Sequence, residues 1–125
     1  MEPIRSFRDL LVWQKGILLV KEIYRATGEF PREEVYGLTS QLRRAAVSIP
    51  SNIAEGYGRR ATVDYIRFLK IASGSLYESQ TQLEIAKELG FLEKEPHTRL
   101  NAMTEELERM LNALIAKLET RANTK

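Results

Sequence analysis

The sequence contains no cysteine and, among its 125 residues, only one histidine, four prolines and five valines. The absence of cysteine excludes disulfide scaffolds, thiolate metal sites and cysteine nucleophiles. No apolar run approaches the roughly 20 residues of a membrane span, and the N-terminus lacks the basic and apolar regions of a secretory signal. We therefore expect a cytoplasmic protein that does not enter a membrane.

The residues that are present favour a helical globular protein. Apolar residues make up 43% of the chain and charged residues 29%, a balance that is too apolar for intrinsic disorder. Leu and Ala together number 27, and both lose little rotamer freedom in a helix. The length fits a single domain, residues 1–125, and no repeat or linker divides it.

Apolar residues recur at three- and four-residue steps in four stretches, which predicts four amphipathic helices. The first is expected at about residues 7–27, with Ser6 and Asp9 as a capping-box start and Gly28 as a left-handed end. Its core face is predicted to consist of Leu10, Trp13, Ile17, Val20 and Tyr24.

The other three helices are expected at about residues 31–58, 62–89 and 96–121, with a kink or short break at Pro50. Short connections make successive helices antiparallel. The predicted fold is therefore all-α, an antiparallel up-down-up-down four-helix bundle. Apolar and small residues outside the predicted core faces indicate self-association; they are Val12, Leu19, Ile23, Phe68, Ile71 and Ser75.

Charge is unevenly distributed, although the net charge is only +2. Residues 41–77 hold six Lys and Arg against two Asp and Glu, whereas residues 78–119 hold five against nine. We expect the basic residues to line one end and side of the hairpin formed by the second and third helices. Arginine makes bidentate contacts to phosphate, and a tyrosine in the turn could stack on an unpaired base. The predicted nucleic-acid contacts are Arg43, Arg44, Tyr57, Arg59, Arg60, Arg67 and Lys70.

The same charges allow a second interpretation. They could be ordinary solvated residues, or they could pair with the acidic half of a neighbouring subunit or of another protein. In that case the protein would be a structural or adaptor oligomer, with the basic patch used in assembly.

The sequence gives little support for an enzyme. Glu55 is the only ionisable group in the polar stretch 48–58, which we interpret as structural because a lone carboxylate makes a poor catalytic set. His97, beside Pro96, is expected to be an exposed turn residue. No Glu-x-x-His pair is present to build a di-metal site. We expect no catalysis, no metal and no cofactor.

Several longer strings are specific enough to indicate a family. They span the chain from residue 7 to about residue 92, and the last helix is similar only in pattern. The chain resembles the bacterial four-helix-bundle proteins called 23S rRNA-intervening sequence proteins. The strings that carry the resemblance are Phe7-Arg8-Asp9-Leu10, Val12-Trp13-Gln14-Lys15, Phe30-Pro31, Tyr36-Gly37-Leu38, Ser40-Gln41-Leu42-Arg43-Arg44-Ala45-Ala46, Ser48-Ile49-Pro50, Asn52-Ile53-Ala54-Glu55-Gly56 and Ile71-Ala72-Ser73-Gly74-Ser75-Leu76-Tyr77-Glu78.

This resemblance implies a bundle that assembles with copies of itself as a five-membered ring. The family is also similar to accessory proteins of diversity-generating retroelements, which are basic pentamers that engage nucleic acid and a reverse transcriptase. By that analogy RNA or DNA, and a protein such as a reverse transcriptase, are the expected partners. The positions it favours for nucleic-acid contact are Arg43, Arg44, Arg59 and Arg60.

Overall fold

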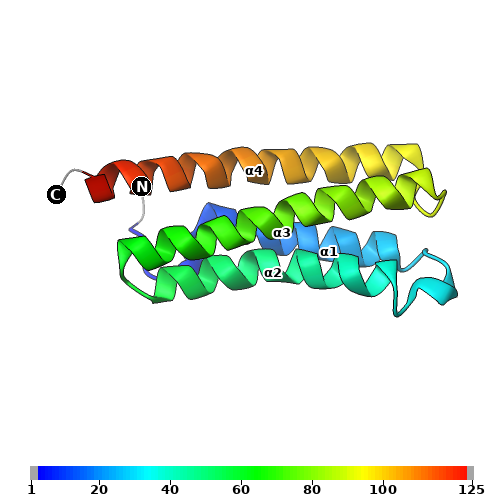
Figure 1. Ribbon diagram of the computed structural model, residues 1–125, viewed down its shortest axis with the longest axis horizontal. Coiled ribbons are helices and arrows are strands. Elements are labelled where there is room, and N and C mark those ends of the chain that lie inside the picture. The colour runs from blue at the N-terminus through cyan, green and yellow to red at the C-terminus, as the bar shows by residue number, and fades with distance from the viewer. Residues whose placement is uncertain (1–2, 124–125) are drawn as a thin grey trace.

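The computed structural model describes residues 3–123, which form four α-helices and two short 3-10 turns without any strand. The helices are α1 (Leu11–Thr27), α2 (Leu38–Gly58), α3 (Thr62–Glu88) and α4 (Lys94–Asn123), and the turns are η1 (Phe7–Asp9) and η2 (Arg32–Glu34). The chain reverses direction at each connection, so successive helices run up and down (Figure 1). The predicted all-α four-helix bundle is confirmed.

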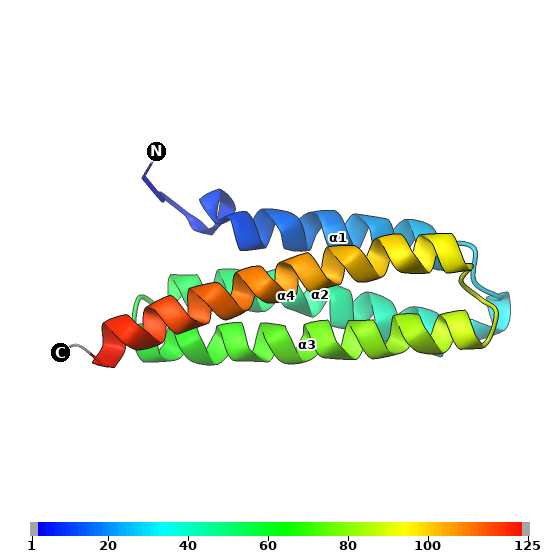
Figure 2. The ribbon, with the colours of Figure 1, turned by 90° about the horizontal axis from the view of Figure 1, so that it is seen from above.

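The helices form a closed ring of neighbours. α1 and α3 each contact α2 and α4, and the diagonal pairs make no contact across residues 3–123. Figure 2 shows α4 passing obliquely in front of α2, with α1 on one side of the bundle and α3 on the other. Because the number of helices is even, the first described residues, the α2–α3 turn and the end of α4 all lie at one end of the bundle. This end carries the site described below.

The buried core runs along all four helices, and α1 contributes a different face from the predicted one. Its buried residues are Val12, Gly16, Leu19, Ile23 and Thr27, whereas Ile17 and Tyr24 are exposed. Gly16 explains why this face is the buried one, since a Cβ at this position would lie 3.3 Å from Cβ of Pro50. The missing side chain lets α1 approach α2 closely on this face. The predicted apolar stripe therefore lies on the flank of α1, beside α2.

Local signals were correct at some helix ends and wrong at others. Ser6 and Asp9 form the predicted capping box, but it opens η1 and not α1. Gly28 was expected to be left-handed and has a φ of −61°, so that prediction was wrong. The second helix begins at Leu38, after η2, and continues through Pro50 without a break. The kink at Pro50 stays a prediction. Gly90, with a φ of 81°, does follow the end of α3.

His97 does not lie in an exposed turn. α4 begins at Lys94, which places His97 in its first turns, with its side chain buried against the bundle. Its Nε2 lies 3.3 Å from Oε1 of Glu84 on α3. The reason is that the helix starts two residues before Pro96, so His97 lies one turn before Leu100 on the buried face of α4.

Candidate nucleic-acid interface

The seven predicted contact residues are divided between two parts of the molecule. Tyr57, Arg59, Arg60 and Arg67 surround the α2–α3 turn. Arg43 and Arg44 lie near the other end of α2, which at 1.5 Å per residue is roughly 20 Å from Gly58. The structure therefore brings four of the seven together, with Lys70 about one turn beyond Arg67 on α3.

The partly buried side chain of Arg43 bridges α2 and the end of α1. Its Nε donates a 2.8 Å hydrogen bond to Oγ1 of Thr27, and its guanidinium lies 4.4 Å from the centre of the Tyr24 ring. These contacts tie α2 to the last turn of α1, where a cation is also favourable to the helix dipole. The geometry gives Arg43 a structural role.

Arg44 has an exposed side chain with no ion-pair partner among residues 3–123. It borders a groove of about 340 Å³ between α2 and α3. Inside that groove Oγ of Ser48 and Oγ of Ser75 are 2.8 Å apart, and Nδ2 of Asn52 donates to Oγ of Ser48 at 2.9 Å. The bond between Ser48 and Ser75 joins the two helices, and the bond from Asn52 stays within α2. Both support the structural interpretation of this polar stretch.

Arg59 and Arg67 are arranged around one aromatic ring. Their guanidinium carbons lie 5.1 and 4.8 Å from the centre of the Phe68 ring. Arg59 also pairs with Glu55 at 3.1 Å, and Arg67 approaches Asp64 at 3.8 Å. Exposed pairs within one helix contribute little to stability. Both arginines can therefore exchange these partners for a phosphate.

The two helices carrying these arginines approach closely at Gly56. A Cβ at this position would lie 2.6 Å from Cβ of Phe68 and 3.3 Å from the carbonyl oxygen of Tyr65. Only glycine fits without a shift of the neighbouring helix. This contact of Gly56 with α3 positions the α2–α3 turn.

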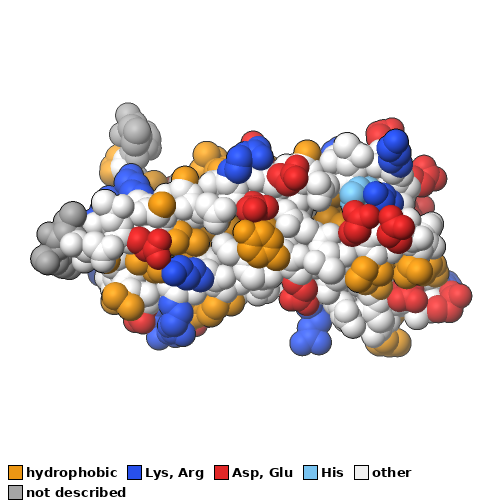
Figure 3. Space-filling view, turned by 45° about the horizontal axis from the view of Figure 1, so that its top comes forward, with side chains coloured by type: hydrophobic (Ala, Val, Ile, Leu, Met, Phe, Trp, Pro, Cys, Tyr) orange, Lys and Arg blue, Asp and Glu red, His pale blue; other side chains and the backbone are white. Residues whose placement is uncertain are grey.

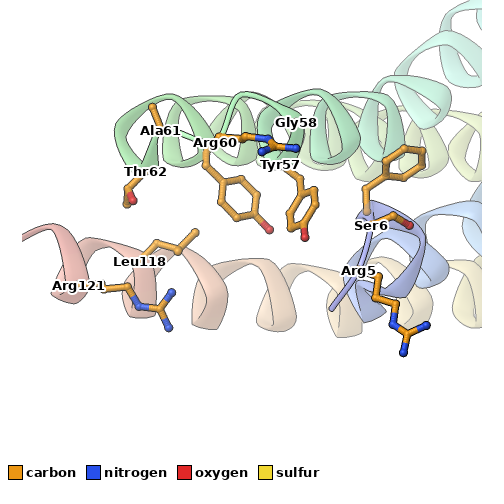
Figure 4. Close-up of a pocket in the computed structure, with 11 residues that line it drawn as sticks. Arg5, Ser6, Tyr57, Gly58, Arg60, Ala61, Thr62, Leu118 and Arg121 are labelled. Atoms are coloured by element: carbon orange, nitrogen blue, oxygen red, sulfur yellow. The ribbon is translucent and has the colours of Figure 1, made fainter. Parts of the chain in front are cut away.

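Arg60 forms part of a pocket of about 580 Å³ at this end of the bundle. Figure 4 shows Arg60 and Tyr57 on the wall formed by the α2–α3 turn, with Arg121 and Leu118 on α4 and Arg5 and Ser6 beside η1. The backbone of Arg60 is left-handed, with a φ of 66°, the one non-glycine residue of the described chain with a positive φ.

Arg5 and Arg121 were absent from the predicted site. They are 116 positions apart in the sequence, and neither belongs to the charge window 41–77. One signal could have found them. An up-down-up-down bundle places both chain ends beside the middle turn, so basic residues near the two termini belong with those of the turn.

Tyr65 contributes a hydroxyl group to the same pocket. Its oxygen is buried and has no hydrogen-bond partner. The ring of Tyr65 meets that of Tyr57 edge to face, with centroids 5.9 Å apart. Burial, together with the neighbouring Tyr57, raises the pKa of Tyr65 to about 12. The phenol therefore stays a hydrogen-bond donor at neutral pH.

The charges separate along the long axis of the bundle. We call residues 3–9, 55–70 and 117–123 the basic end; they hold eight Lys and Arg against four Asp and Glu. Residues 21–34 and 84–99 form the acidic end, with six against eight. Figure 3 shows acidic side chains gathered over the acidic end on the α4 side. The predicted polarity is thus along the bundle, with α4 contributing Lys117 and Arg121 to the basic end.

Residues 3–123 contain no group of three or more His, Asp or Glu side chains placed to hold a metal ion. Within the same range, no helix is both long and apolar enough to cross a membrane. At the acidic end a hydrogen bond from Lys87 lowers the pKa of the exposed Glu84.

Comparison with known proteins places the chain in a family. The family model described as "23S rRNA-intervening sequence protein" matches residues 8–113. A crystal structure described as a protein with unknown function from the S23 ribosomal protein family of Bacteroides thetaiotaomicron is similar, with a TM-score of 0.76. The two chains are 22% identical, and the match covers 84% of this chain and 98% of the other. This likeness supports the fold. Comparison with proteins of curated function finds no match. The family model covers most of the bundle, and the chain belongs to the 23S rRNA-intervening sequence protein family.

Proposed function

We propose that this protein is a non-enzymatic, self-associating bundle that binds nucleic acid through its basic end. The observation that carries the proposal is the meeting of arginines from separate segments at one end of the molecule. Arg5, Arg60 and Arg121 border one pocket, and Arg59 and Arg67 lie beside it on the ring of Phe68. Arginine forks at this density match the repeated phosphates of a nucleic-acid strand.

Tyr57 adds an aromatic surface to this cationic one. Its side chain is half-buried in the pocket wall and leaves part of the ring accessible. Aromatic rings stack on unpaired bases with little sequence preference. Single strands or looped RNA are therefore the preferred ligands in this proposal, ahead of a regular duplex. Arg43 and Arg44 contribute little to binding, because they lie far from the basic end.

Self-association is supported by a second surface, the apolar flank of α1 and α2. Trp13, Ile17 and Val20 on α1 border a shallow groove of about 300 Å³ with Val47 and Ala54 on α2. Ile17 and Val47 are exposed at 36% and 40%. An apolar surface of this kind on a small bundle favours contact with another copy. The five-membered ring, and a reverse transcriptase as a protein partner, stay predictions from the family resemblance.

The experiment is a fluorescence-anisotropy titration of a structured RNA, a duplex DNA and a single strand over a range of salt concentrations. The test variant is Arg59→Ala/Arg60→Gly/Arg67→Ala. The matched control, Arg32→Ala/Arg44→Ala/Lys94→Ala, removes three exposed positive charges elsewhere. Light scattering measures the mass of each variant. We expect a steep decrease of affinity with salt, and loss of binding only in the test variant.

Two outcomes would contradict the proposal. Equal losses in the test and control variants would mean that binding follows overall charge and not the basic end. Dissociation of the oligomer in the test variant would mean that these arginines serve assembly, which is the adaptor interpretation. The variant Ile17→Asp/Val47→Asp tests the apolar flank separately, and it should lower the mass to that of the monomer.

A further inference from the structure

The pocket at the basic end has an unusual chemical lining. Besides Arg5, Arg60 and Arg121 it is lined by the hydroxyl-bearing residues Ser6, Tyr57, Thr62 and Tyr65, and its lining contains no Asp or Glu. Arg60 forms no ion pair within the described chain. A pocket lined by cations and hydrogen-bond donors, with no carboxylate, is complementary to a compact anion.

From this lining we propose that the pocket binds the phosphate monoester of a single nucleotide, either at the end of a nucleic-acid strand or in a free nucleotide. The inference rests on the proposed function in that it gives the basic end a specific ligand. A monoester carries nearly two negative charges near neutral pH, whereas each internal phosphodiester carries one. A cluster of arginines therefore distinguishes the end of a strand from its interior.

The size of the pocket agrees with one nucleotide. A volume of about 580 Å³ lies in the range of sites for small molecules, and it is too small for a length of double helix. One side of the pocket is apolar. Phe7 and Leu118 line it together with the ring of Tyr57. A base can lie on this side while the phosphate faces Arg60.

The backbone of Arg60 supports a role in binding. A left-handed conformation costs little for glycine and is unfavourable for a residue with a side chain. The chain nevertheless carries an arginine at this position, with a φ of 66°. Unfavourable backbone conformations of this kind concentrate at ligand sites. The guanidinium group of Arg60 is therefore the natural anchor for the phosphate.

Tyr65 provides an independent observation. Its hydroxyl is buried at the pocket wall without a hydrogen-bond partner. A buried polar group that lacks a partner lowers stability, so such groups call for an explanation. A small movement of the Tyr65 ring would open this shielded hydroxyl to the pocket, and a phosphate oxygen there would accept its hydrogen bond.

The test uses three labelled single strands of about 12 nucleotides with one sequence. The first ends in a 5′-phosphate, the second in a 3′-phosphate, and the third in hydroxyl groups at both ends. Titration calorimetry with a nucleoside 5′-monophosphate supplies the free ligand. We expect at least one phosphorylated strand to bind about tenfold more tightly than the hydroxyl-ended strand. We also expect the monophosphate to bind and to compete with that strand.

Two variants and a control assign the effect to the pocket. Arg60→Gly keeps the left-handed backbone and should make the affinities for phosphorylated and hydroxyl-ended strands equal. Tyr65→Phe should reduce the preference, and Arg44→Ala should leave it unchanged. Circular dichroism checks that each variant is folded.

The outcomes separate this inference from the proposed function. Equal wild-type affinity for all three strands, with a steep salt dependence, overturns the pocket assignment and leaves the basic end as a nucleic-acid surface. Binding of the monophosphate without binding of any strand supports the pocket and contradicts the proposed function. If neither the monophosphate nor any strand binds, the pocket assignment and the proposed function are both wrong.

Discussion

Each end of the bundle holds a pocket of similar size. The arginines of one pocket are paired with a carboxylate, and Arg60 in the other is not. At the acidic end, Arg25 and Arg99 line a pocket of about 490 Å³, and each donates to Glu22 at 2.8 Å. At the basic end, Arg60 lines a pocket without any carboxylate. The contrast shows that arginine content alone does not define an anion site. What matters is whether the chain itself already supplies the anion.

The largest effect is expected when charge is exchanged between the two ends, which tests whether the position of the charges controls binding. The variant Arg59→Glu/Arg67→Glu should bind RNA about 100-fold more weakly, since it loses two phosphate contacts and adds repulsion. Adding Glu29→Lys/Glu93→Lys restores the wild-type net charge of +2. We expect the compensated protein to stay at least tenfold weaker than wild type in the anisotropy titration. Recovery of full affinity would mean that net charge, and not its position, controls binding.

At the basic end α2 and α3 meet closely at Gly56, and substitution of this glycine tests the contact. Gly56→Ala should destabilise the protein by about 2 kcal/mol, because its Cβ would overlap the Phe68 side chain and push α3 away. Gly74→Ala is the matched control, since no atom lies within 4 Å of the added Cβ. That change should stabilise α3 by up to about 1 kcal/mol. Urea unfolding measures both, and equal effects would contradict the close approach.

At the acidic end, the test is to remove the Glu22 carboxylate that pairs with Arg25 and Arg99. Glu22→Gln should lower stability by about 1 kcal/mol, since Arg25 and Arg99 both lose an ion pair at a partly exposed site. Glu29 lines the same pocket and forms no ion pair among residues 3–123. Glu29→Gln should therefore change stability little. Thermal unfolding at low and high salt separates the two. The Glu22 effect should shrink as salt screens the pairs.

The sequence predicted the architecture because the pattern repeats over long stretches. Four helices with apolar residues at three- and four-residue steps have few ways to bury those residues, and a bundle follows. Which face of α1 is buried was harder to predict from the sequence. Val12, Leu19 and Ile23 form one apolar stripe, and Trp13, Ile17 and Val20 form another beside it. Only the close approach of Gly16 to Pro50 decides which one is buried.

The candidate site was predicted in part for a related reason. The charge window found Arg59, Arg60 and Arg67 because they are near one another in the sequence. It also included Arg43, whose hydrogen bond to Thr27 depends on how α1 ends and is not encoded in the spacing of charges. It missed Arg121, which reaches the pocket only through the direction of α4. Position in the bundle, once the topology is known, is a better guide than nearness in the sequence.

The smallest predicted effect concerns the pH dependence that Tyr65 gives to the basic end. Its pKa is raised from 10.0 to about 12, mainly by burial, so the folded protein holds this proton more tightly than the unfolded chain does. The stabilisation that this provides is fully present below pH 10 and is lost as the pH rises toward about 12. Tyr65 as a whole is only partly buried, which keeps the effect small. Wild type should therefore lose stability between pH 9 and pH 11.5 more steeply than Tyr65→Phe in urea unfolding at the two pH values.

Below pH 9 the variant should be as stable as wild type or more so, because it removes a buried hydroxyl without a partner. Parallel pH profiles for the two proteins would show that the hydroxyl is solvated in the folded state, and its availability to a ligand in the pocket would then need another explanation.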